Sequence, residues 1–563
     1  MTAEEQGPGE EGPVEEAPVE EAPVEEAPVE EAPVEEAPGR TGPVGSVLVV
    51  GAGIAGMQAA LDMADTSILV HVVEDQPGIG GWMSKLDKTF PTNDCSMCIL
   101  APKLVEVGRH PNIVLHTNAR VTDLEGEEGA FRATIVERPR FIDPVACTGC
   151  GFCGQYCPVE AISEYDEGVG DRPAVNVLYP QTVPLLYSID REACIGCGLC
   201  EEVCPAHAVD YMQEPVTVEA DVGAVVLAAG YAEVPATTRP EYGWGRFPNV
   251  VTAPQFERIL SSSGPFAGEV LRPSDGKHPR KIAWLQCVGS RDPHHGRPYC
   301  SSVCCTYATK EAIIAKEHLG RGNVDCHVFF MDMRTYGKAF EEYYNRAVDE
   351  YGVKYTRCRV GEVRQDPGTR DLVINYEDEE GNERSEVFDL VVLSTGLEPP
   401  EDNQELAATF GIELDEHGFA STGVFDPVGT NRPGVFVCGA LGGPKDIPDT
   451  VAQASAAAAR AEAIVAPSRG TEITPVTMPE ERDVMDEDVR IGVFVCHCGI
   501  NIGSVVDVPD VVEHARRLPS VAYAEENLYT CSQDTQDNMK ERIRELGLNR
   551  VVVASCTPLT HEP

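Results

Sequence analysis

The chain has 563 residues, 42% of them hydrophobic, so it is long enough for several domains with cores of their own. Its formal net charge of −48 argues against nucleic-acid binding, because a protein that contacts phosphates needs a basic face. There are 21 cysteines, no N-terminal apolar signal segment and no apolar stretch of the ~18 residues that span a bilayer, so we expect a cytoplasmic protein whose thiols bind metal or do redox chemistry.

Residues 1–45 are expected to be a disordered acidic tail. Residues 13–37 are five copies of PVEEA, and 14 glutamates fall within the first 38 residues. Regular proline, charge of one sign and almost no bulky apolar side chain cannot offset the entropy lost on ordering. A solvated spacer is the favoured role, and partner binding is the alternative.

Residues 46–75 predict a strand–helix–strand unit: SVLVV, then GAGIAGMQAALDMAD, then ILVHVVED. The turn carries Gly51-x-Gly53-x-x-Gly56, and Glu74 lies twenty-one residues after Gly53. The glycines allow a tight turn close to a pyrophosphate at the helix N-terminus, and the acid accepts a ribose hydroxyl. The pattern therefore predicts a dinucleotide site, and the glycine pair that follows favours FAD over NAD.

Three later strand–turn pieces support a flavoprotein: GAVVLAAGY, DLVVLSTGLEPP and GVFVCGALGGPKDIPDT. Each is an apolar strand that ends in small residues, as where a nucleotide-binding domain returns to its sheet. In the last piece Ala440 stands where such flavoproteins usually have aspartate, so the contact is expected from Asp446. The further candidate FAD-binding residues are Gly80, Gly81, Gly230, Gly439 and Asp446.

A second dinucleotide domain normally has an NAD(P)H glycine loop after its first strand, here KIAWLQCVGS at 281–290. That loop is absent, and cysteines stand in its place: Cys287, Cys300, Cys304 and Cys305. The polar intervening loop, and a following helix whose N-terminus favours thiolates, indicate a metal cluster, although free cysteine is also a common core residue. Lys310 in that helix either faces the flavin and stabilises its reduced, anionic form or is a solvated surface lysine.

Residues 147–158 and 194–205 read CTGCGFCGQYCP and CIGCGLCEEVCP. Each is the C-x2-C-x2-C-x3-C-P run of two-cluster ferredoxins, in which the fourth cysteine of each run binds the other cluster. Zinc is disfavoured, because zinc motifs rarely repeat this run with both prolines. The predicted [4Fe–4S] ligands are Cys147, Cys150, Cys153 and Cys204 for one cluster, and Cys194, Cys197, Cys200 and Cys157 for the other.

Near the end of the chain, VRIGVFVCHCG and NRVVVASCTP are strands that lead to cysteines, with helical patterns at 508–517 and 534–547 between them. The carboxyl ends of parallel strands share one sheet edge, so these cysteines are expected to converge. A fourth cluster and plain buried cysteines are the two interpretations. The residues concerned are Cys496, Cys498, Cys531 and Cys556.

Cys95 and Cys98 form a C-x2-C within FPTNDCSMCILAPKL. A redox dithiol and half of a metal site both rank below a structural role close to the flavin. The chain stops at THEP with no closing helix after its last strand, which favours a truncated or split gene product.

The elements together predict an α/β flavoprotein with two dinucleotide-type domains, an inserted α+β two-cluster ferredoxin domain and a small C-terminal α/β domain. After the tail, the expected order is an FAD-binding domain at 46–140, the ferredoxin insert at 141–214, more of the FAD-binding domain at 215–280, a second Rossmann-like domain at 281–388, the return of the FAD-binding domain at 389–465, a linker at 466–488 and the small domain at 489–563.

Residues 46–563 resemble the A subunit of the heterodisulfide reductase family, which is the FAD and iron–sulfur subunit of methanogens and many anaerobes. The resemblance rests on the ferredoxin insert and on GAGIAG, FPTNDCSMCILAPKL, QCVGSRD with YCSSVCCTYATK, GPKDIPDTVAQASAAAA, VFVCHCGINIG, NLYTCS and LNRVVVASCTPLTHEP. It implies a thioredoxin-reductase-like flavin domain and an unusual [4Fe–4S] cluster beside the flavin, held by Cys287, Cys300, Cys304 and Cys305.

The resemblance also implies a flavin that splits electron pairs between two routes. Residues 490–563, however, resemble the family's amino-terminal domain although they follow the flavin domain here, and the family's C-terminal ferredoxin domain is absent. Simple electron transfer is therefore favoured over bifurcation.

We expect an oxidoreductase: the FAD- and [4Fe–4S]-dependent subunit of a heterodisulfide-reductase-like complex, which converts two-electron flavin chemistry into one-electron transfer. Implied partners are a disulfide-reducing subunit, a small iron–sulfur subunit, a hydrogenase or dehydrogenase donor, and ferredoxin, with no direct membrane insertion. The alternatives are the flavin subunit of a quinone-interacting membrane-bound oxidoreductase complex and an iron–sulfur scaffold or redox sensor without turnover.

Overall fold

The computed structural model describes residues 42–474, 483–498, 502–503 and 505–556. The PVEEA repeats, part of the predicted linker and the final THEP lie outside the described residues. By their internal contacts the residues divide into Met1–Thr41 and Gly42–Pro563, and the elements below all belong to the second unit.

The first sheet has five parallel strands in the order β24-β13-β1-β2-β5. Apolar runs such as SVLVV form its strands because both faces of a parallel sheet are covered. Alanines of α1 (Ile54–Ala64) and α9 (Ile447–Val465) belong to the core on this sheet, which lets the two helices approach closely. The strands are β1 Ser46–Val50, β2 Leu69–Glu74, β5 Ile113–Thr117, β13 Ala224–Leu227 and β24 Val435–Val437.

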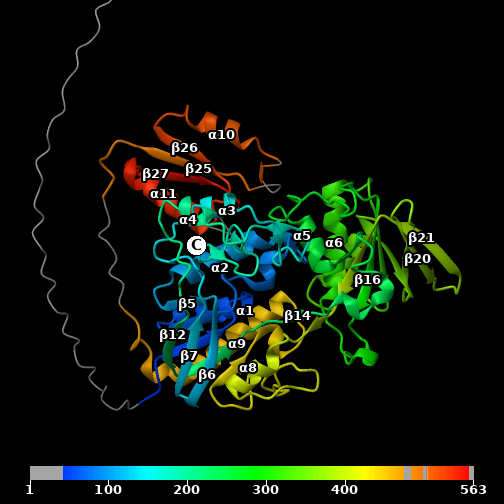
Figure 1. Ribbon diagram of the computed structural model, residues 1–563, viewed down its shortest axis with the longest axis horizontal. Coiled ribbons are helices and arrows are strands. Elements are labelled where there is room, and N and C mark those ends of the chain that lie inside the picture. The colour runs from blue at the N-terminus through cyan, green and yellow to red at the C-terminus, as the bar shows by residue number, and fades with distance from the viewer. Residues whose placement is uncertain (1–41, 475–482, 499–501, 504, 557–563) are drawn as a thin grey trace, which may run out of the picture. The chain divides into compact units, whose positions relative to one another are not determined.

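An antiparallel sheet, β12-β7-β6, carries the ferredoxin insert (Figure 1). Its strands are β6 Ala119–Glu127, β7 Ala130–Glu137 and β12 Val216–Val222. β7 and β12 are direct neighbours, with Glu137 opposite Val216. Residues 138–215 therefore leave the sheet and return to it at one point, as a very long hairpin connection.

Within the insert, the two cysteine runs have the same local geometry. Helix α3 (Phe152–Gln155) follows Gly151, at φ 83°, and α4 (Leu199–Glu202) follows Gly198, at φ 78°. Only glycine adopts such a left-handed backbone readily, so the spacing between the cysteines depends on these positions. Short antiparallel pairs complete the insert: β8 Ala161–Ile162 with β9 Asp171–Arg172, and β10 Val175–Asn176 with β11 Ser188–Ile189.

The second α/β sheet is also parallel, in the order β15-β22-β16-β17-β18. It corrects one expectation. β22 (Leu390–Thr395), assigned from the sequence to the return of the FAD-binding domain, pairs with β16 (Lys281–Val288) instead, and β15 (Val250–Thr252) pairs with β22. Short apolar strands look alike in sequence, and only pairing decides their sheet. The other elements here are β17 Asp325–Phe330, β18 Lys354–Arg357, α5 Ala253–Leu260, α6 Cys304–Leu319 and α7 Phe340–Asp349.

Two chain crossings join the sheets. β14 (Ala232–Glu233) and β23 (Leu397–Glu398) pair as an antiparallel ribbon between the first and second α/β sheets. Further elements are the antiparallel sheet β19 Val363–Gln365, β20 Leu372–Glu377 and β21 Glu383–Phe388, the pair β3 Lys88–Thr89 and β4 Asp94–Cys95, and helices α2 Ser96–Arg109 and α8 Asn403–Phe410.

The last segment is a three-stranded parallel sheet, β26-β25-β27, with helices α10 and α11. The two helices and two of the strands agree with the predicted pattern. The middle strand in the chain, β26, was missed because its residues, VAYAEEN, alternate in burial and carry two acids. The bounds are β25 Ile491–Cys496, α10 Val508–Ala515, β26 Val521–Asn527, α11 Gln533–Glu545 and β27 Arg550–Ala554.

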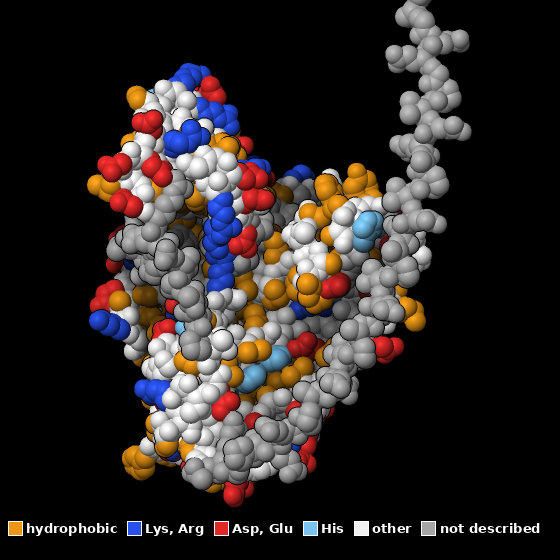
Figure 2. Space-filling model, turned by 90° about the vertical axis from the view of Figure 1, so that its left-hand side faces the viewer, with side chains coloured by type: hydrophobic (Ala, Val, Ile, Leu, Met, Phe, Trp, Pro, Cys, Tyr) orange, Lys and Arg blue, Asp and Glu red, His pale blue; other side chains and the backbone are white. Residues whose placement is uncertain are grey.

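Among the described residues, none of the helices is long and apolar enough to cross a membrane. On the face drawn in Figure 2, Lys and Arg side chains gather in the upper half, with a vertical run near its centre, and acidic side chains lie beside them.

Candidate functional site

The glycine turn after β1 is built for close approach. Gly51 has φ 94°, and a Cβ there would lie 2.4 Å from the Ala228 carbonyl oxygen. A Cβ on Gly56 would lie 1.8 Å from the Gly51 carbonyl oxygen, so only glycine lets α1 start this close to the turn. Gly53 caps α1 and leaves the N-terminus of that helix open to the cavity. An N-terminus exposed in this way favours a phosphate.

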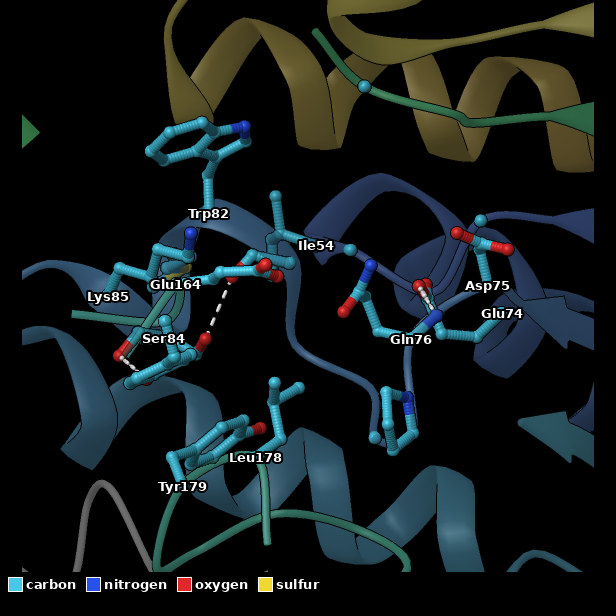
Figure 3. A pocket seen from close by; sticks show the side chains of 18 of the residues that line it. Ile54, Glu74, Asp75, Gln76, Trp82, Ser84, Lys85, Glu164, Leu178 and Tyr179 are labelled. Atoms are coloured by element: carbon cyan, nitrogen blue, oxygen red, sulfur yellow. Dashed lines mark hydrogen bonds between the residues drawn. The ribbon is translucent and has the colours of Figure 1, made fainter. Parts of the chain in front are cut away.

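Glu74 ends β2 with its carboxylate held by two backbone donors. The Ala52 N–H donates to Oε2 at 2.7 Å, and the Gln76 N–H donates to Oε1 at 2.9 Å. Burial raises the pKa of Glu74 above its usual value, and these donors oppose that shift. Figure 3 shows Glu74 and Gln76 at one end of the pocket. The acid thus lies beside the glycine turn, where the sequence pattern predicts a ribose contact.

The glycine turn and Glu74 open into one large cavity of about 1250 Å³. Towards its other end lies Trp82, which stacks on Tyr231 with ring centroids 5.2 Å apart. The Lys85 ammonium lies 4.5 Å from the Trp82 ring centroid (Figure 3). Small-molecule pockets usually have about 300–1,000 Å³, so this cavity has room for a dinucleotide.

Most of the predicted cofactor-contact residues lie on this cavity. Gly80 does not line it: a Cβ on Gly80 would lie 2.6 Å from the Tyr179 hydroxyl, so it is a packing glycine. Asp446 lines the cavity, but its carboxylate accepts the Asp449 N–H at 2.9 Å and caps α9. The predicted glycines that line the cavity are Gly51, Gly53, Gly81, Gly230 and Gly439.

These residues fit FAD. The turn leaves no room for side chains next to a pyrophosphate, a helix N-terminus faces the cavity, and an acid stands at the end of the next strand. The sequence did not single out Lys445 on the same wall, whose Nζ donates to the carbonyl oxygens of Gly439 and Gly443. Burial lowers the pKa of Lys445 to about 8.

Lys310 is buried, with 1% of its surface exposed, and lines the cavity. The alternative of a solvated surface lysine is therefore excluded. Its ammonium donates to Glu257 of α5, so it enters the pocket as part of an ion pair. Glu257 and the neighbouring acid Glu311 were missed, because no motif marks them and they meet only through helix packing.

The four cysteines that replace the NAD(P)H loop come together around the start of α6. Cys304 interacts electrostatically with Cys287, Cys300 and Cys305. Cys305 likewise interacts with Cys287 and Cys300. Burial raises the pKa of Cys305 to about 11 and that of Cys304 well above its usual value. Metal binding requires the thiolate form, so a cluster here would have to bind these cysteines as thiolates.

This cysteine group borders the cavity. The Cys304 thiol donates to the Thr395 carbonyl oxygen at 3.8 Å, and the Tyr307 hydroxyl donates to the same oxygen at 2.7 Å. Both Tyr307 and Thr395 line the cavity. A single carbonyl oxygen therefore separates a predicted cluster ligand from the cavity wall.

In the insert, four thiols surround one small apolar cavity: those of Cys147, Cys150, Cys153 and Cys204. Cys204 comes from the second run, so the predicted exchange of the fourth ligand agrees with the geometry. Gly151 and Tyr187 line both this cavity and the large one. The other predicted set, Cys194, Cys197, Cys200 and Cys157, lies on the equivalent backbone of the repeat and stays a prediction.

No group of His, Cys, Asp or Glu side chains among the described residues is arranged to hold a single metal ion. An iron–sulfur cube is wider than one ion, so thiols spread around a cavity are the arrangement it requires. The donor set of four cysteines per site suits iron–sulfur chemistry.

The C-terminal cysteines converge as predicted, and they meet Cys95 and Cys98. The Cys98 sulfur lies 3.7 Å from the Cys556 sulfur. Hydrogen bonds with Cys556 and Cys95 raise the pKa of Cys98. A hydrogen bond from Cys498 lowers the pKa of Cys496 to about 5. Burial, together with electrostatic interactions with Cys496 and Cys556, raises the pKa of Cys531 to about 12.

Three family models match the chain. A 4Fe-4S dicluster domain matches residues 146–208, an NAD(P)-binding Rossmann-like domain matches residues 49–102, and a pyridine nucleotide-disulphide oxidoreductase model matches residues 324–460. They cover the cysteine runs, the glycine turn and the segment from the second α/β sheet to α9.

Curated relatives match most of the chain. The iron-sulfur A subunit of the CoB–CoM heterodisulfide reductase of Methanocaldococcus jannaschii is 44% identical over 80% of this chain and 68% of its own length. The A subunit of the H(2):CoB-CoM heterodisulfide,ferredoxin reductase of Methanothermobacter marburgensis is 46% identical over 80% of this chain and 67% of its own length. The chain belongs to the family of heterodisulfide reductase A subunits.

Another family member, the iron-sulfur A subunit numbered 2 of Methanopyrus kandleri, is 48% identical over 74% of this chain, which spans 64% of that relative's length. Membership of the heterodisulfide reductase family confirms the predicted resemblance and the predicted oxidoreductase class. Together with the matched models it supports FAD and [4Fe–4S] as cofactors, without a cluster number. The relatives are named as single subunits, which implies a complex of several subunits.

Among solved structures, thioredoxin reductase from Lactococcus lactis is 14% identical with a TM-score of 0.43, covering 75% of this chain and 99% of its own. Thioredoxin reductase from T. acidophilum is 13% identical with a TM-score of 0.42, covering 75% and 98%. The predicted fold class, a two-domain flavoprotein with a ferredoxin insert, is confirmed by the two parallel sheets and the matched family models.

Proposed function

We propose that this member of the heterodisulfide reductase family is a flavin- and iron–sulfur-dependent electron-transfer subunit. The observation that carries the proposal is a shared wall. Gly151 and Tyr187 line both the large cavity and the small cavity of the first cysteine set, while Tyr307 and Cys304 donate to one carbonyl oxygen. Both observations support the proposal that two cluster sites would border the dinucleotide pocket.

FAD would exchange electrons both in pairs and singly, whereas each cluster alone carries one electron at a time. The chain's own residues have three tasks. The glycine turn and Glu74 hold the cofactor, Trp82 and Tyr231 wall one end of the pocket, and the thiols around it hold centres that carry one electron each.

The number of clusters is part of the proposal. Two belong to the ferredoxin insert and a third to the group that includes Cys287 and Cys300. A fourth would be held by Cys496, Cys498, Cys531 and Cys556, whose convergence on the Cys95–Cys98 pair supports a site at this junction. Cytoplasmic location, expected from the use of cysteine, also stays a prediction.

The proposed partners follow from the relatives' names. Those proteins are named for a CoB–CoM heterodisulfide and, in several cases, for ferredoxin. A ferredoxin and a disulfide-reducing subunit are therefore the partners proposed for this chain. The proposal extends to electron bifurcation, in which each of the two cluster routes that leave the pocket would receive electrons from the flavin separately.

The test is anaerobic loading of the full chain with iron, sulfide and FAD, followed by quantification of iron and flavin and stepwise reduction. We expect bound flavin, bleaching of its visible absorbance on reduction, and paramagnetic signals from reduced clusters. Absence of retained flavin, or of any paramagnetic cluster signal, overturns the proposal.

A further inference from the structure

Four ionisable side chains meet inside the protein at the wall of the large cavity. Asp87, Glu257, Lys310 and Glu311 are 6%, 3%, 1% and 0% exposed. They come from the loop after the 3-10 helix Gly81–Lys85, from α5 and from α6. Burial of four such groups together has a large electrostatic cost unless their charges balance.

Direct hydrogen bonds join three of the four, Asp87, Glu257 and Lys310. The Lys310 ammonium donates to Oε1 of Glu257, and the Asp87 backbone N–H donates to Oε2 of the same carboxylate at 3.1 Å. Trp284 Nε1 donates to Oε2 of Glu311 at 2.8 Å. Glu257, Lys310 and Glu311 all line the cavity.

The charges do not balance if all three carboxyls are ionised. Lys310 supplies one positive charge for three acids. The nearby Arg258 donates instead to Asp166 at 3.0 Å and to the Lys85 carbonyl oxygen at 2.9 Å. Two carboxylate oxygens, Asp87 Oδ2 and Glu311 Oε1, have no hydrogen-bond partner among the described residues. A buried carboxylate oxygen without a donor favours the protonated acid.

Burial and the negative charge of Glu257 raise the pKa of Glu311 well above its usual value. The same two causes raise the pKa of Asp87 to about 7. The other titratable groups that act on this set are Lys88, Arg258, Cys95, Tyr231, Tyr307 and Tyr343.

We propose that Asp87, Glu257, Lys310 and Glu311 form a proton store that serves the pocket. When a two-electron carrier bound there receives two electrons from the chain's iron–sulfur centres, the O–H bond of the Glu311 acid breaks and its proton passes to the carrier. The Lys310 ammonium stabilises the carboxylates that remain, and oxidation of the carrier returns the proton to Glu311. This inference rests on the proposed function, because it requires a two-electron carrier in the pocket.

The test is reduced-minus-oxidised infrared difference spectroscopy on the full chain, loaded anaerobically with FAD and iron–sulfur clusters, in H2O and in D2O. The wild type is expected to lose a protonated-carboxyl C=O band on reduction, and deuterium should shift that band. Glu311→Gln should remove the band while flavin content stays unchanged. Glu317→Gln, on the same helix with an exposed side chain that accepts the Tyr351 hydroxyl at 2.7 Å, should keep it.

Trp284→Phe serves as a second variant, because it removes the donor to Glu311 and should shift the band without removing it. A wild-type spectrum without a carboxyl band, or a band that survives Glu311→Gln unshifted, overturns the proton store. The carbonyl bands of the flavin appear in the same spectra. Their presence without a carboxyl band counts against the store alone, and their absence counts against the proposed function.

Discussion

The Cys98 sulfur lies 3.7 Å from the Cys556 sulfur, although 458 residues separate the two in the chain. A second contact lies at the other end of the same helix, α2 (Ser96–Arg109), where Arg109 pairs with Asp537 of α11 at 2.7 Å. One helix of the flavin-binding part therefore carries both contacts to the last segment. Thiols from the two parts meet at that junction.

Cys556→Ser is predicted to lower the iron content of the anaerobically loaded chain by one cluster, because it removes one of four thiolate ligands. Iron per protein, measured by elemental analysis, checks this. Cys326→Ser is the control: Cys326 lies on β17 of the second α/β sheet, is buried, and donates to the Ala312 carbonyl oxygen of α6. Equal iron in the Cys556 variant and in the wild type would remove the C-terminal cluster from the proposal.

Glu74→Ala is predicted to weaken FAD binding about 10- to 100-fold, since a hydrogen bond to a charged group contributes roughly 1.5–3 kcal/mol. In the wild type the Ala52 and Gln76 N–H groups donate to this carboxylate, so its loss also leaves these two donors without their acceptor. Titration of the flavin-free chain with FAD, followed by flavin fluorescence, measures the change. Glu106→Ala, an exposed acid on α2, should leave the affinity as it is, and an unchanged affinity for Glu74→Ala would contradict the assigned role.

Exchange of the fourth ligand in the insert predicts which cysteine variants resemble each other. Cys204→Ser and Cys153→Ser should damage the same cluster, because both thiols line one small cavity, although they belong to different runs. Cys200→Ser should damage the other. Paramagnetic resonance of the reduced protein should give matching spectra for the first pair and a different spectrum for the third variant. If Cys204→Ser instead matches Cys200→Ser, each run holds its own cluster.

Glu233 on β14 predicts a pH-dependent stability. Burial raises its pKa from 4.5 to about 8, while the Thr395 hydroxyl donates to its carboxylate. The folded chain therefore binds a proton that the unfolded chain has lost between these pH values, so this residue's contribution falls as the pH rises from about 4.5 to 8 and is level above that.

Glu233→Gln keeps a neutral side chain of the same shape at every pH. The melting temperature of the wild type should drop relative to Glu233→Gln across that pH interval. The pKa shift sets an upper limit of about 5 kcal/mol on the corresponding loss in the free energy of unfolding. Calorimetry at several pH values measures the difference. A difference between the two proteins that does not change with pH would mean that Glu233 stays ionised in the fold.

Features that depend on neighbours in sequence were predictable. The turn through Gly51 and Gly56 admits no side chain, and the left-handed backbone at Gly151 and Gly198 spaces the cluster cysteines, so the residue pattern carries the geometry directly. The cysteine runs likewise predict their ligands, because an iron–sulfur cube needs four thiolates at fixed reach.

Features that depend on pairing between distant segments were not predictable. β22 was assigned to the wrong sheet, since an apolar strand looks the same in either. The group of Asp87, Glu257 and Glu311 arises where three segments pack together, and no local pattern marks a buried acid. Cys98 was expected to be structural, and only the fold brings it to Cys556.

The hairpin position of the insert has a consequence for how such proteins arise. Glu137 and Val216 face each other across β7 and β12, and opposed residues of antiparallel strands are only about 5 Å apart. A two-residue turn can span that gap, so the pairing of β7 with β12 does not itself require residues 138–215, although Tyr179 and Val183 of this segment now belong to the core on the first sheet. An ancestral flavoprotein could therefore have acquired the two ferredoxin-type cysteine runs by a single insertion between β7 and β12.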